Sequence, residues 1–502
     1  MDILGNLALG FSVALSPINL LYAFVGVLVG TLIGVLPGIG PVATIAMLLP
    51  TTYGLPPVTA LIMLAGIYYG ASFGGSTTAI LVNLPGEMSS VITVLDGHQM
   101  ARQGRAGAAL CIAALGSFFA GTVATMVIAA FAPPLAEMAL KFDAAEYFSL
   151  MVLGLTSAVA LANGSMLKAT LMTILGLLLG IVGTDVNSGV ARFSFNLPEL
   201  VDGIGFVAIT MGLFAFAEIA LNLEQADRRS VFTERIGGLW IKWQEFKQAL
   251  PAILRGIAIG SLLGILPGGG ATLSAFASYA LERKSAKDPT RFGKGAIEGV
   301  AGPESANNAG AQTSFIPMLT LGIPSNAVMS LMVGALIIND IQPGPQVMTK
   351  NPDLFWGLIV SMWIGNLILV ILNLPLVGIW VRLLSVPYRL LFPVIVLACT
   401  IGAFSTNNSM FDVWIAVLFG VLGYVFLKLG CEPAPLLLGY ILGPMLEENL
   451  RRALVLSRGD FTVFLTRPIS LVMLLMAAGL LLLIAAPVIR ARRDAIFVDE
   501  QR

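Results

Sequence analysis

Long apolar segments alternate with short polar ones along the chain, and the first apolar segment is the most extreme. From Ile3 to Gly86 there is no Asp, Glu, Lys, Arg or His. A transmembrane helix needs about 20 mostly apolar residues, and in lipid an open chain satisfies its backbone polar groups only as a helix. Further apolar segments follow at 107–136, 148–167, 169–183, 203–220, 354–381, 390–411, 413–427 and 468–489. With the regions 3–86, 256–281 and 305–339 included, the pattern predicts an all-α polytopic membrane protein with about 10–12 membrane elements.

Composition supports the same class. Of the 502 residues, 57% are hydrophobic and only 11% are charged, whereas a soluble domain carries about 25% charged residues. The 28 basic and 28 acidic residues cancel, which leaves no electrostatic case for nucleic-acid binding. The cysteines Cys111, Cys399 and Cys431 form no CxxC pair and indicate neither a disulfide framework nor a metal site. The first Lys or Arg is Arg102, so we expect the first apolar segment to be retained as a membrane helix rather than cleaved.

Basic residues gather in two loops, which the positive-inside rule places in the cytoplasm. The loop 223–255 holds six Lys or Arg residues and the loop 282–294 holds five. We expect 1–222 to form a first membrane repeat, 223–255 a basic cytoplasmic connecting loop, 256–467 a second membrane repeat, and 468–502 a final membrane helix with a short tail. Arginines flank this final helix on both sides, so the sequence leaves the side of the C-terminus open.

The division into two repeats rests on an internal duplication. Residues 26–40 read GVLVGTLIGVLPGIG and residues 256–270 read GIAIGSLLGILPGGG, with eight of fifteen positions identical. A looser pair is GASFGGSTTAILVNLPGE at 70–87 and GAQTSFIPMLTLGIPSNA at 310–327. Gly at every fourth position is typical of close helix packing, whereas the Leu-Pro-Gly-x-Gly that ends both copies should break the helix. Broken helices at matching positions of two halves point to the binding site of a secondary transporter.

We expect the two halves to be inverted with respect to the membrane, each with a broken or re-entrant hairpin. Basic loops flank the second copy on both sides, which favours a hairpin that starts and ends in the cytoplasm. The first copy has no Lys or Arg near it, as expected for a hairpin rooted on the outer side. About five apolar segments separate the copies, and an odd number of spans also inverts the topology.

The polar positions inside these segments are mostly neutral. A broken helix exposes N–H groups that suit a carboxylate and carbonyl groups that suit a cation, so the breaks and the polar residues near them are the candidate substrate-binding residues. These are Gly38, Gly40, Ser72, Ser76, Thr77, Thr78, Asn83, Gly268, Gly270, Asn307, Asn308, Gln312, Thr313, Ser314, Ser325 and Asn326. For any single Ser or Thr, an interhelical hydrogen bond is the alternative role. Among the flanking acidic residues, Glu87, Glu304 and Asp340 are candidates for coupling transport to sodium or protons, and we expect no cofactor and no resident metal.

Two other classes of function remain open. His98 is the single histidine and lies two residues after Asp96, a pair able to do acid–base chemistry in a membrane-embedded enzyme, although a polar loop is the simpler interpretation. An uncoupled, channel-like membrane subunit is the second alternative. The chain has no GxxxxGK[ST] motif, so it does not itself hydrolyse ATP through a P-loop.

Several longer motifs resemble the large membrane subunit of the bacterial tripartite tricarboxylate transporters. They are GVLPGIGP (34–41), YYGASFGGSTTAILVNLPGE (68–87), DGHQMARQGRAG (96–107), GILPGGGATLSAFASYALERK (264–284), PESANNAGAQTSFIPMLTLGIPS (303–325) and LLGYILGPMLEENLRRAL (437–454). The resemblance implies a permease in the bacterial inner membrane that imports citrate or another di- or tricarboxylate, driven by a sodium or proton gradient. It also implies two partners, a small four-helix membrane subunit and a periplasmic solute-binding protein. The resemblance fixes neither the carboxylate nor the coupling ion.

Overall fold

The computed structural model describes residues 3–36, 40–83, 86–162, 165–185, 188–224, 238, 240–266, 270–383 and 388–485. Its first half consists of the following elements in chain order: α1 (Ile3–Ala14), α2 (Pro17–Val35), α3 (Pro41–Leu48), η1 (Leu49–Thr52), α4 (Pro57–Val82), η2 (Met88–Ser90), α5 (Val91–Thr93), η3 (Val94–His98), η4 (Ala101–Arg105), α6 (Ala106–Ala139), α7 (Ala144–Leu161), α8 (Met166–Gly180), the two-residue strands β1 (Gly183–Thr184) and β2 (Ala191–Arg192), η5 (Pro198–Leu200), α9 (Phe206–Thr210), η6 (Met211–Phe216) and α10 (Ala217–Glu224).

The regular elements of the second half are all helices in its described residues. Its elements are α11 (Trp243–Leu263), α12 (Gly270–Ser285), η8 (Pro289–Arg291), α13 (Glu298–Thr313), α14 (Phe315–Leu321), α15 (Ala327–Ile338), α16 (Gln346–Lys350), α17 (Pro352–Asn373), α18 (Val377–Leu383), α19 (Tyr388–Asn407), α20 (Met410–Lys428), α21 (Pro433–Leu456), α22 (Val463–Thr466) and α23 (Pro468–Ala485).

Seven helices in the described ranges are long and apolar enough to cross a membrane, and seven shorter apolar helices accompany them. This confirms the predicted all-α polytopic class. Several predicted segments are divided differently. The segment 148–167 is shared between α7 and α8, 354–381 between α17 and α18, and 390–411 between α19 and α20.

Helix α11 begins at Trp243, well before the expected end of the connecting loop at residue 255. The Trp243 ring stacks on Phe246, and Lys247 lies over the Trp243 ring. Aromatic and long basic side chains of this kind favour the membrane–water interface, and here they extend the helix beyond its purely apolar part. The helix α11 is therefore longer than the uncharged segment 256–281 indicated, because it begins thirteen residues earlier.

Helices α2 and α4 pack backbone to backbone. A Cβ atom added at Gly26, Gly30 or Gly34 of α2 would lie on the backbone carbonyl of Met63, Ile67 or Ala71 of α4, respectively. Because the residue numbers rise together along both helices, α2 and α4 run parallel. The chain must therefore return between them, and α3 and η1 lie on that return path.

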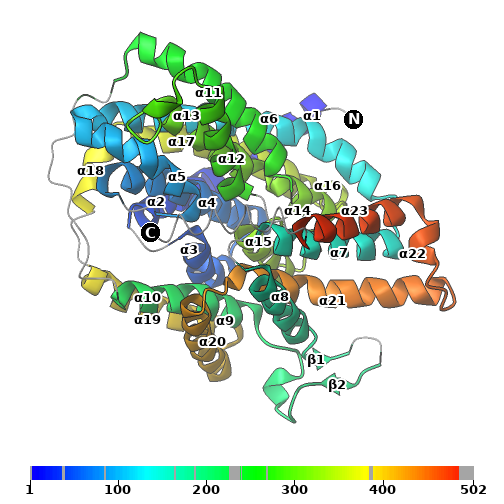
Figure 1. Ribbon diagram of the computed structural model, residues 1–502. Helices are drawn as coiled ribbons and strands as arrows, with labels where there is room; N and C mark the ends of the chain where they lie inside the picture. The colour runs from blue at the N-terminus through cyan, green and yellow to red at the C-terminus, as the bar shows by residue number, and fades with distance from the viewer. Residues whose placement is uncertain are drawn as a thin grey trace.

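The second half repeats this arrangement with α11 and α13. A Cβ atom at Gly256, Gly260 or Gly264 of α11 would lie on or beside the backbone carbonyl of Gly302, Ala306 or Gly310 of α13. These helices are also parallel, and α12 is the return. Arg255 of α11 binds Glu282 of α12 with contacts of 2.7 and 2.6 Å, so α11 and α12 form an antiparallel hairpin in which the last turn of α12 lies beside the middle of α11. In Figure 1, α11, α12 and α13 lie together in green in the upper part of the molecule.

The two parallel pairs run antiparallel to each other. Ser76 of α4 contacts Glu304 of α13. Tyr69, which precedes Ser76 in the chain, has its ring 6.1 Å from the ring of Phe315, which follows Glu304. The residue numbers therefore fall along one pair as they rise along the other. An antiparallel arrangement of this kind supports the expected inversion of the two halves, which itself stays a prediction.

The looser sequence pair needs a shift of one residue. Asn83 and Gly322 both end their helices in the left-handed conformation, with φ of 59° and 74°. Glu87 and Asn326, four residues later, are both extended residues that begin the next helix. Asn83 therefore corresponds to Gly322, and not to Ile323 as the aligned sequences suggested. The left-handed position explains the substitution, because Gly and Asn tolerate it best.

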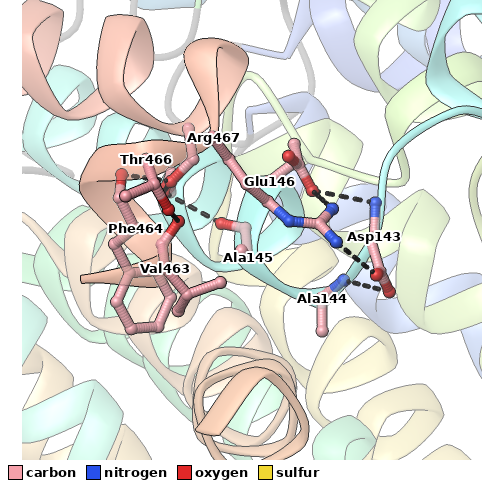
Figure 2. Close-up of polar contacts among 10 residues, drawn as sticks. Asp143, Ala144, Ala145, Glu146, Val463, Phe464, Thr466 and Arg467 are labelled. Atoms are coloured by element: carbon pink, nitrogen blue, oxygen red, sulfur yellow. Dashed lines mark hydrogen bonds and ion pairs between the residues drawn. The ribbon is translucent and has the colours of Figure 1, made fainter. Parts of the chain in front are cut away.

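Charged residues in the C-terminal third are paired with acids at helix ends. Arg467, just before α23, binds Glu146 and Asp143 at the start of α7, each at 3.0 Å (Figure 2). Asp143 and Glu146 also cap α7. Arg451 and Arg192 share Glu447. These ion pairs connect the segment before α23 to the start of α7, and α21 to β2.

Candidate functional site

A buried carboxylate lies where the two helix pairs meet. Glu304 on α13 is 1% exposed and accepts hydrogen bonds from Ser76 of α4, at 2.7 Å, and from Thr93 of α5. It takes part in none of the ion pairs of the described residues. A carboxylate buried with hydroxyl partners alone needs a proton or a cation to offset its charge. This makes Glu304 the most suggestive of the three predicted coupling residues.

Glu87 lies close to Glu304, and Asp340 does not join them. Glu87 is half-buried at the start of η2, where it accepts from Ser89. Asp340 is an exposed turn residue with φ of 56° beyond the end of α15. The structure therefore brings together two of the three acidic candidates.

The first break is the segment 36–40 between α2 and α3, and the second is the segment 266–270 between α11 and α12. The second break lies beside a separate group of polar side chains. Tyr68 of α4 is within reach of the side chains of Ser314 and Asn326. Gly270, the first residue of α12, has φ of +49°, and a Cβ atom there would lie 3.3 Å from the Asn326 amide nitrogen. Asn326 also caps α15 through the Met329 N–H, at 2.9 Å. This group joins a break in the second half to a helix of the first half.

The first break is held by an acidic residue from a third region. The backbone N–H of Gly40, which precedes α3, donates to the Glu218 carboxylate of α10 at 3.1 Å. The N-terminus of α3 therefore already binds a carboxylate, as expected from its unpaired N–H groups and its dipole. The remaining predicted break residues, Gly38 and Gly268, lie outside the described residues.

Most of the predicted hydroxyl and amide donors form hydrogen bonds within and between helices. Each bonds a backbone carbonyl or a neighbouring side chain: Thr77 to Phe73, Thr78 to Val35, Thr313 to Ala309, Ser325 to Ser314, Asn308 to Ser117, and Gln312 to Thr125 and Asn366. Thr78 makes the interhelical bond stated as the alternative role, and Thr313 adds one to the Gly260 carbonyl at 3.4 Å, whereas Thr77 bonds only within its own helix. Ser314 likewise bonds the Ala311 carbonyl at 2.6 Å.

Two asparagines differ from the other polar candidates. Asn83 is exposed at the left-handed end of α4. Asn307 is fully buried, and neither atom of its amide has a hydrogen-bond partner in the described part of the chain. A buried amide without partners costs free energy, which a ligand contact would offset.

The residues of the proposed acid–base pair have separate structural roles. Asp96 is fully buried and accepts from the backbone of Gly295 and Ala296, each at 2.8 Å, and from the Tyr279 hydroxyl at 3.0 Å. The His98 ring lies 3.1 Å from the Ile80 carbonyl oxygen. Asp96 thus fixes the loop that precedes α13.

Sequence reasoning missed Thr93, Tyr68 and Ser117 as members of these polar groups. Thr93 and Ser117 are single hydroxyls among apolar neighbours, where the sequence offers no indication of a buried partner. Tyr68 lies inside the quoted motif at 68–87, but an aromatic residue in an apolar helix is typical of packing. Their partners are distant in sequence and become evident only once the helices are placed.

The comparisons with known proteins show the family of this chain. The profile described as the tripartite tricarboxylate transporter TctA family matches residues 20–438. An Agrobacterium vitis 52.8 kDa protein of the TAR-I ttuC′ 3′ region is 58% identical over 500 residues, which covers 100% of both chains. A second protein from that organism, of the TAR-II ttuC′ 3′ region, is 61% identical over 241 residues, 48% of this chain and 100% of its own length. No solved structure matches. By the extent of the family match, the chain is a multi-pass membrane protein that belongs to the TctA family of tripartite tricarboxylate transporters.

Proposed function

We propose that this chain is the permease subunit of a binding-protein-dependent secondary transporter, which imports citrate or another di- or tricarboxylate across the bacterial inner membrane. A sodium or proton gradient drives the uptake. A periplasmic solute-binding protein delivers the substrate, and a small four-helix membrane subunit completes the transporter. The chain itself catalyses no reaction.

The meeting of the two antiparallel helix pairs is the observation that best supports this function. Each pair consists of two parallel helices joined through a break, and the polar residues of both pairs converge at Glu304 and at Tyr68. Secondary transporters place their substrate and ion sites at such breaks, near the middle of the membrane.

The breaks offer contacts for a carboxylate without a buried arginine. Gly40 shows that the first break can donate to a carboxylate, since it holds Glu218. Asn307 adds a buried amide with no partner among the described residues, in the helix that carries Glu304. A substrate carboxylate bound near these groups would gain hydrogen bonds to a charged acceptor, each worth roughly 1.5–3 kcal/mol.

Uptake of labelled carboxylate tests this proposal. We expect a cell that lacks its own citrate uptake to accumulate radioactive citrate, or another di- or tricarboxylate, only when the chain is co-expressed with the small membrane subunit and the binding protein. Asn307→Ala should raise the apparent KM about tenfold, which corresponds to the loss of about one good hydrogen bond. Gly479→Ala, at a position with no atoms within 4 Å, is the matched control and should leave uptake unchanged.

Three outcomes would contradict the proposal. Full activity of the chain alone would remove the need for partners. Equilibration of the substrate without accumulation would favour the channel-like alternative. Loss of activity in His98→Ala at normal expression would favour the enzyme.

A further inference from the structure

A small cavity adjoins Glu304 beside α4 and α6. Its volume is about 10 Å³, which is room for about one water-sized particle. Its polar lining consists of Glu304, the hydroxyls of Ser76, Thr77 and Ser117, and Asn373 at the end of α17. The rest of the lining is apolar and comes from α4 and α6. No Lys, Arg or His of the described residues lines this cavity.

The hydroxyl hydrogens around this cavity are directed at backbone carbonyls or, for Ser76, also at the Glu304 carboxylate. Thr77 donates to the Phe73 carbonyl at 3.2 Å and Ser117 to the Glu304 carbonyl at 3.5 Å. Ser76 can donate to the Ser72 carbonyl at 3.1 Å or to the Glu304 carboxylate at 2.7 Å. A hydroxyl oxygen that has donated its hydrogen has two lone pairs, of which Ser117 uses one to accept from the Asn308 amide at 2.7 Å. The hydroxyls therefore present acceptor oxygens, which suit a cation and not an anion.

Asn373 gives an independent indication of a ligand. Its side chain is 6% exposed, and its amide nitrogen donates to the Leu369 carbonyl at 2.9 Å. Its amide oxygen is buried without a hydrogen-bond partner in the described part of the chain. A buried carbonyl oxygen beside a cavity is costly unless something binds it.

We infer that this cavity binds a sodium ion, held by oxygen atoms of Glu304, Ser76, Thr77, Ser117 and Asn373. Hard cations take oxygen ligands of these types, and a dehydrated sodium ion is no larger than a water molecule. One lining carboxylate balances one positive charge, so the filled site is neutral in a low-dielectric interior. No three His, Cys, Asp or Glu side chains come together in the described ranges, which fits a monovalent rather than a multivalent ion. The inference rests on the proposed function in that the ion would be the coupling ion.

The ligands come from both halves of the molecule. Ser76 and Thr77 lie on α4, Ser117 on α6, Glu304 on α13 and Asn373 on α17. A bound sodium ion would therefore link the first helix pair to the second. Its binding would favour the arrangement in which these helices lie close together.

Direct ion binding to the purified full chain tests the inference without any carboxylate. Radioactive sodium should bind in a scintillation proximity assay, and unlabelled NaCl should displace it, whereas KCl and choline chloride at the same ionic strength should not. Glu304→Gln should abolish binding. Asn373→Leu keeps the size of the side chain, removes one oxygen and should weaken binding about tenfold. Ser361→Ala is the matched control, because Ser361 is a buried hydroxyl of α17 that bonds the Leu358 carbonyl away from the cavity.

The outcomes separate this site from the proposed function. Absence of specific sodium binding by the wild-type chain, or unchanged binding in both Glu304→Gln and Asn373→Leu, would overturn the inference. If Glu304→Gln fails to elute as a single species, the wild-type and Asn373→Leu measurements still decide. Carboxylate uptake that persists without sodium and follows the pH gradient would assign coupling to protons and also overturn it. Sodium binding without carboxylate uptake by the complete system would instead contradict the proposed function alone.

Discussion

The two helix pairs share their glycine packing and differ in the helix that comes after each break. After the second break, α12 packs along α13, where Cβ atoms at Gly302 and Gly310 would meet Ser278, Glu282 and Ser274. The Arg255–Glu282 ion pair closes this unit. After the first break, α3 is only eight residues long, and it lies beside α4 of its own unit as well as beside η6, α15 and α19, with its start held by Glu218. Figure 1 shows α3 in blue below the pair, on the side of α10 and α19.

The duplicated sequence thus determines the helix pair but not its return helix. The second unit, α11–α12–α13, is held by contacts within itself. The first unit has contacts of its own and is also held from outside, by Glu218 of α10 and by α19. Both units bring a parallel helix pair to the same central carboxylate.

The largest expected effect is an all-or-none difference in cysteine labelling between the two segments that connect the parallel helices, α3 with η1 in the first unit and α12 in the second. In a chain lacking Cys111, Cys399 and Cys431, we introduce Thr51→Cys after α3 and Ser285→Cys at the end of α12. Both positions are exposed. If the halves are inverted, a membrane-impermeant thiol reagent applied to intact cells should label only the first, and inside-out vesicles should reverse the result. Labelling of both from one side would remove the inversion.

The next effect concerns the glycine contacts that the two pairs share. Gly30→Val and Gly260→Val each place a branched side chain against a backbone carbonyl that cannot move away, so we expect each to destabilise the protein by at least about 3 kcal/mol. The yield of monodisperse protein and its unfolding temperature in detergent measure this. Gly378→Val, at a position with nothing within 4 Å, should behave like the wild type. A fall in yield and unfolding temperature for only one of Gly30→Val and Gly260→Val would show that the packing of the two pairs is not equivalent.

The smallest effect concerns the Arg255–Glu282 ion pair, which has no counterpart among the described residues of the first unit. Arg255→Met leaves Glu282, with a side chain 2% exposed, without its partner. Breaking a buried pair costs about 3–5 kcal/mol, and we expect about 2–3 kcal/mol here because the Arg255 side chain is 42% exposed. The unfolding temperature should fall, and Ser278→Cys on α12 should become more reactive.

Two variants serve as controls for the ion-pair effect. The double variant Arg255→Met with Glu282→Met should recover most of the stability, since replacing both partners removes the buried charge. Glu218→Gln, the corresponding change at the first break, should leave Ser278→Cys unreactive. An equal response of Ser278→Cys to Arg255→Met and to Glu218→Gln would contradict the separation of the two units.

The sequence predicted the helical membrane class and the breaks because both depend on local properties, namely apolar length and the Leu-Pro-Gly-x-Gly pattern. It also predicted Glu304 as a notable residue, since an acid between apolar segments is rare. It did not show that Gln312 and Asn308 are occupied by hydrogen bonds, because their partners Thr125, Asn366 and Ser117 are distant in sequence. Thr77 bonds the Phe73 carbonyl of its own helix, a local contact that does not depend on how the helices are placed. Asn373 escaped notice because only the placement of α17 beside α4 and α6 reveals its cavity.

The backbone contacts between α2 and α4 have a mechanical consequence. Each glycine of α2 packs directly against a backbone carbonyl of α4, so sliding one helix along the other would bring main-chain atoms into steric clash. Each pair should then move as a rigid body. The interface between the pairs is formed by side chains, among them the Ser76 hydroxyl on the Glu304 carboxylate and the Tyr69 and Phe315 rings, and side chains can exchange partners at lower cost than interlocked backbones. We therefore expect the alternation between inward- and outward-facing states to occur at that interface.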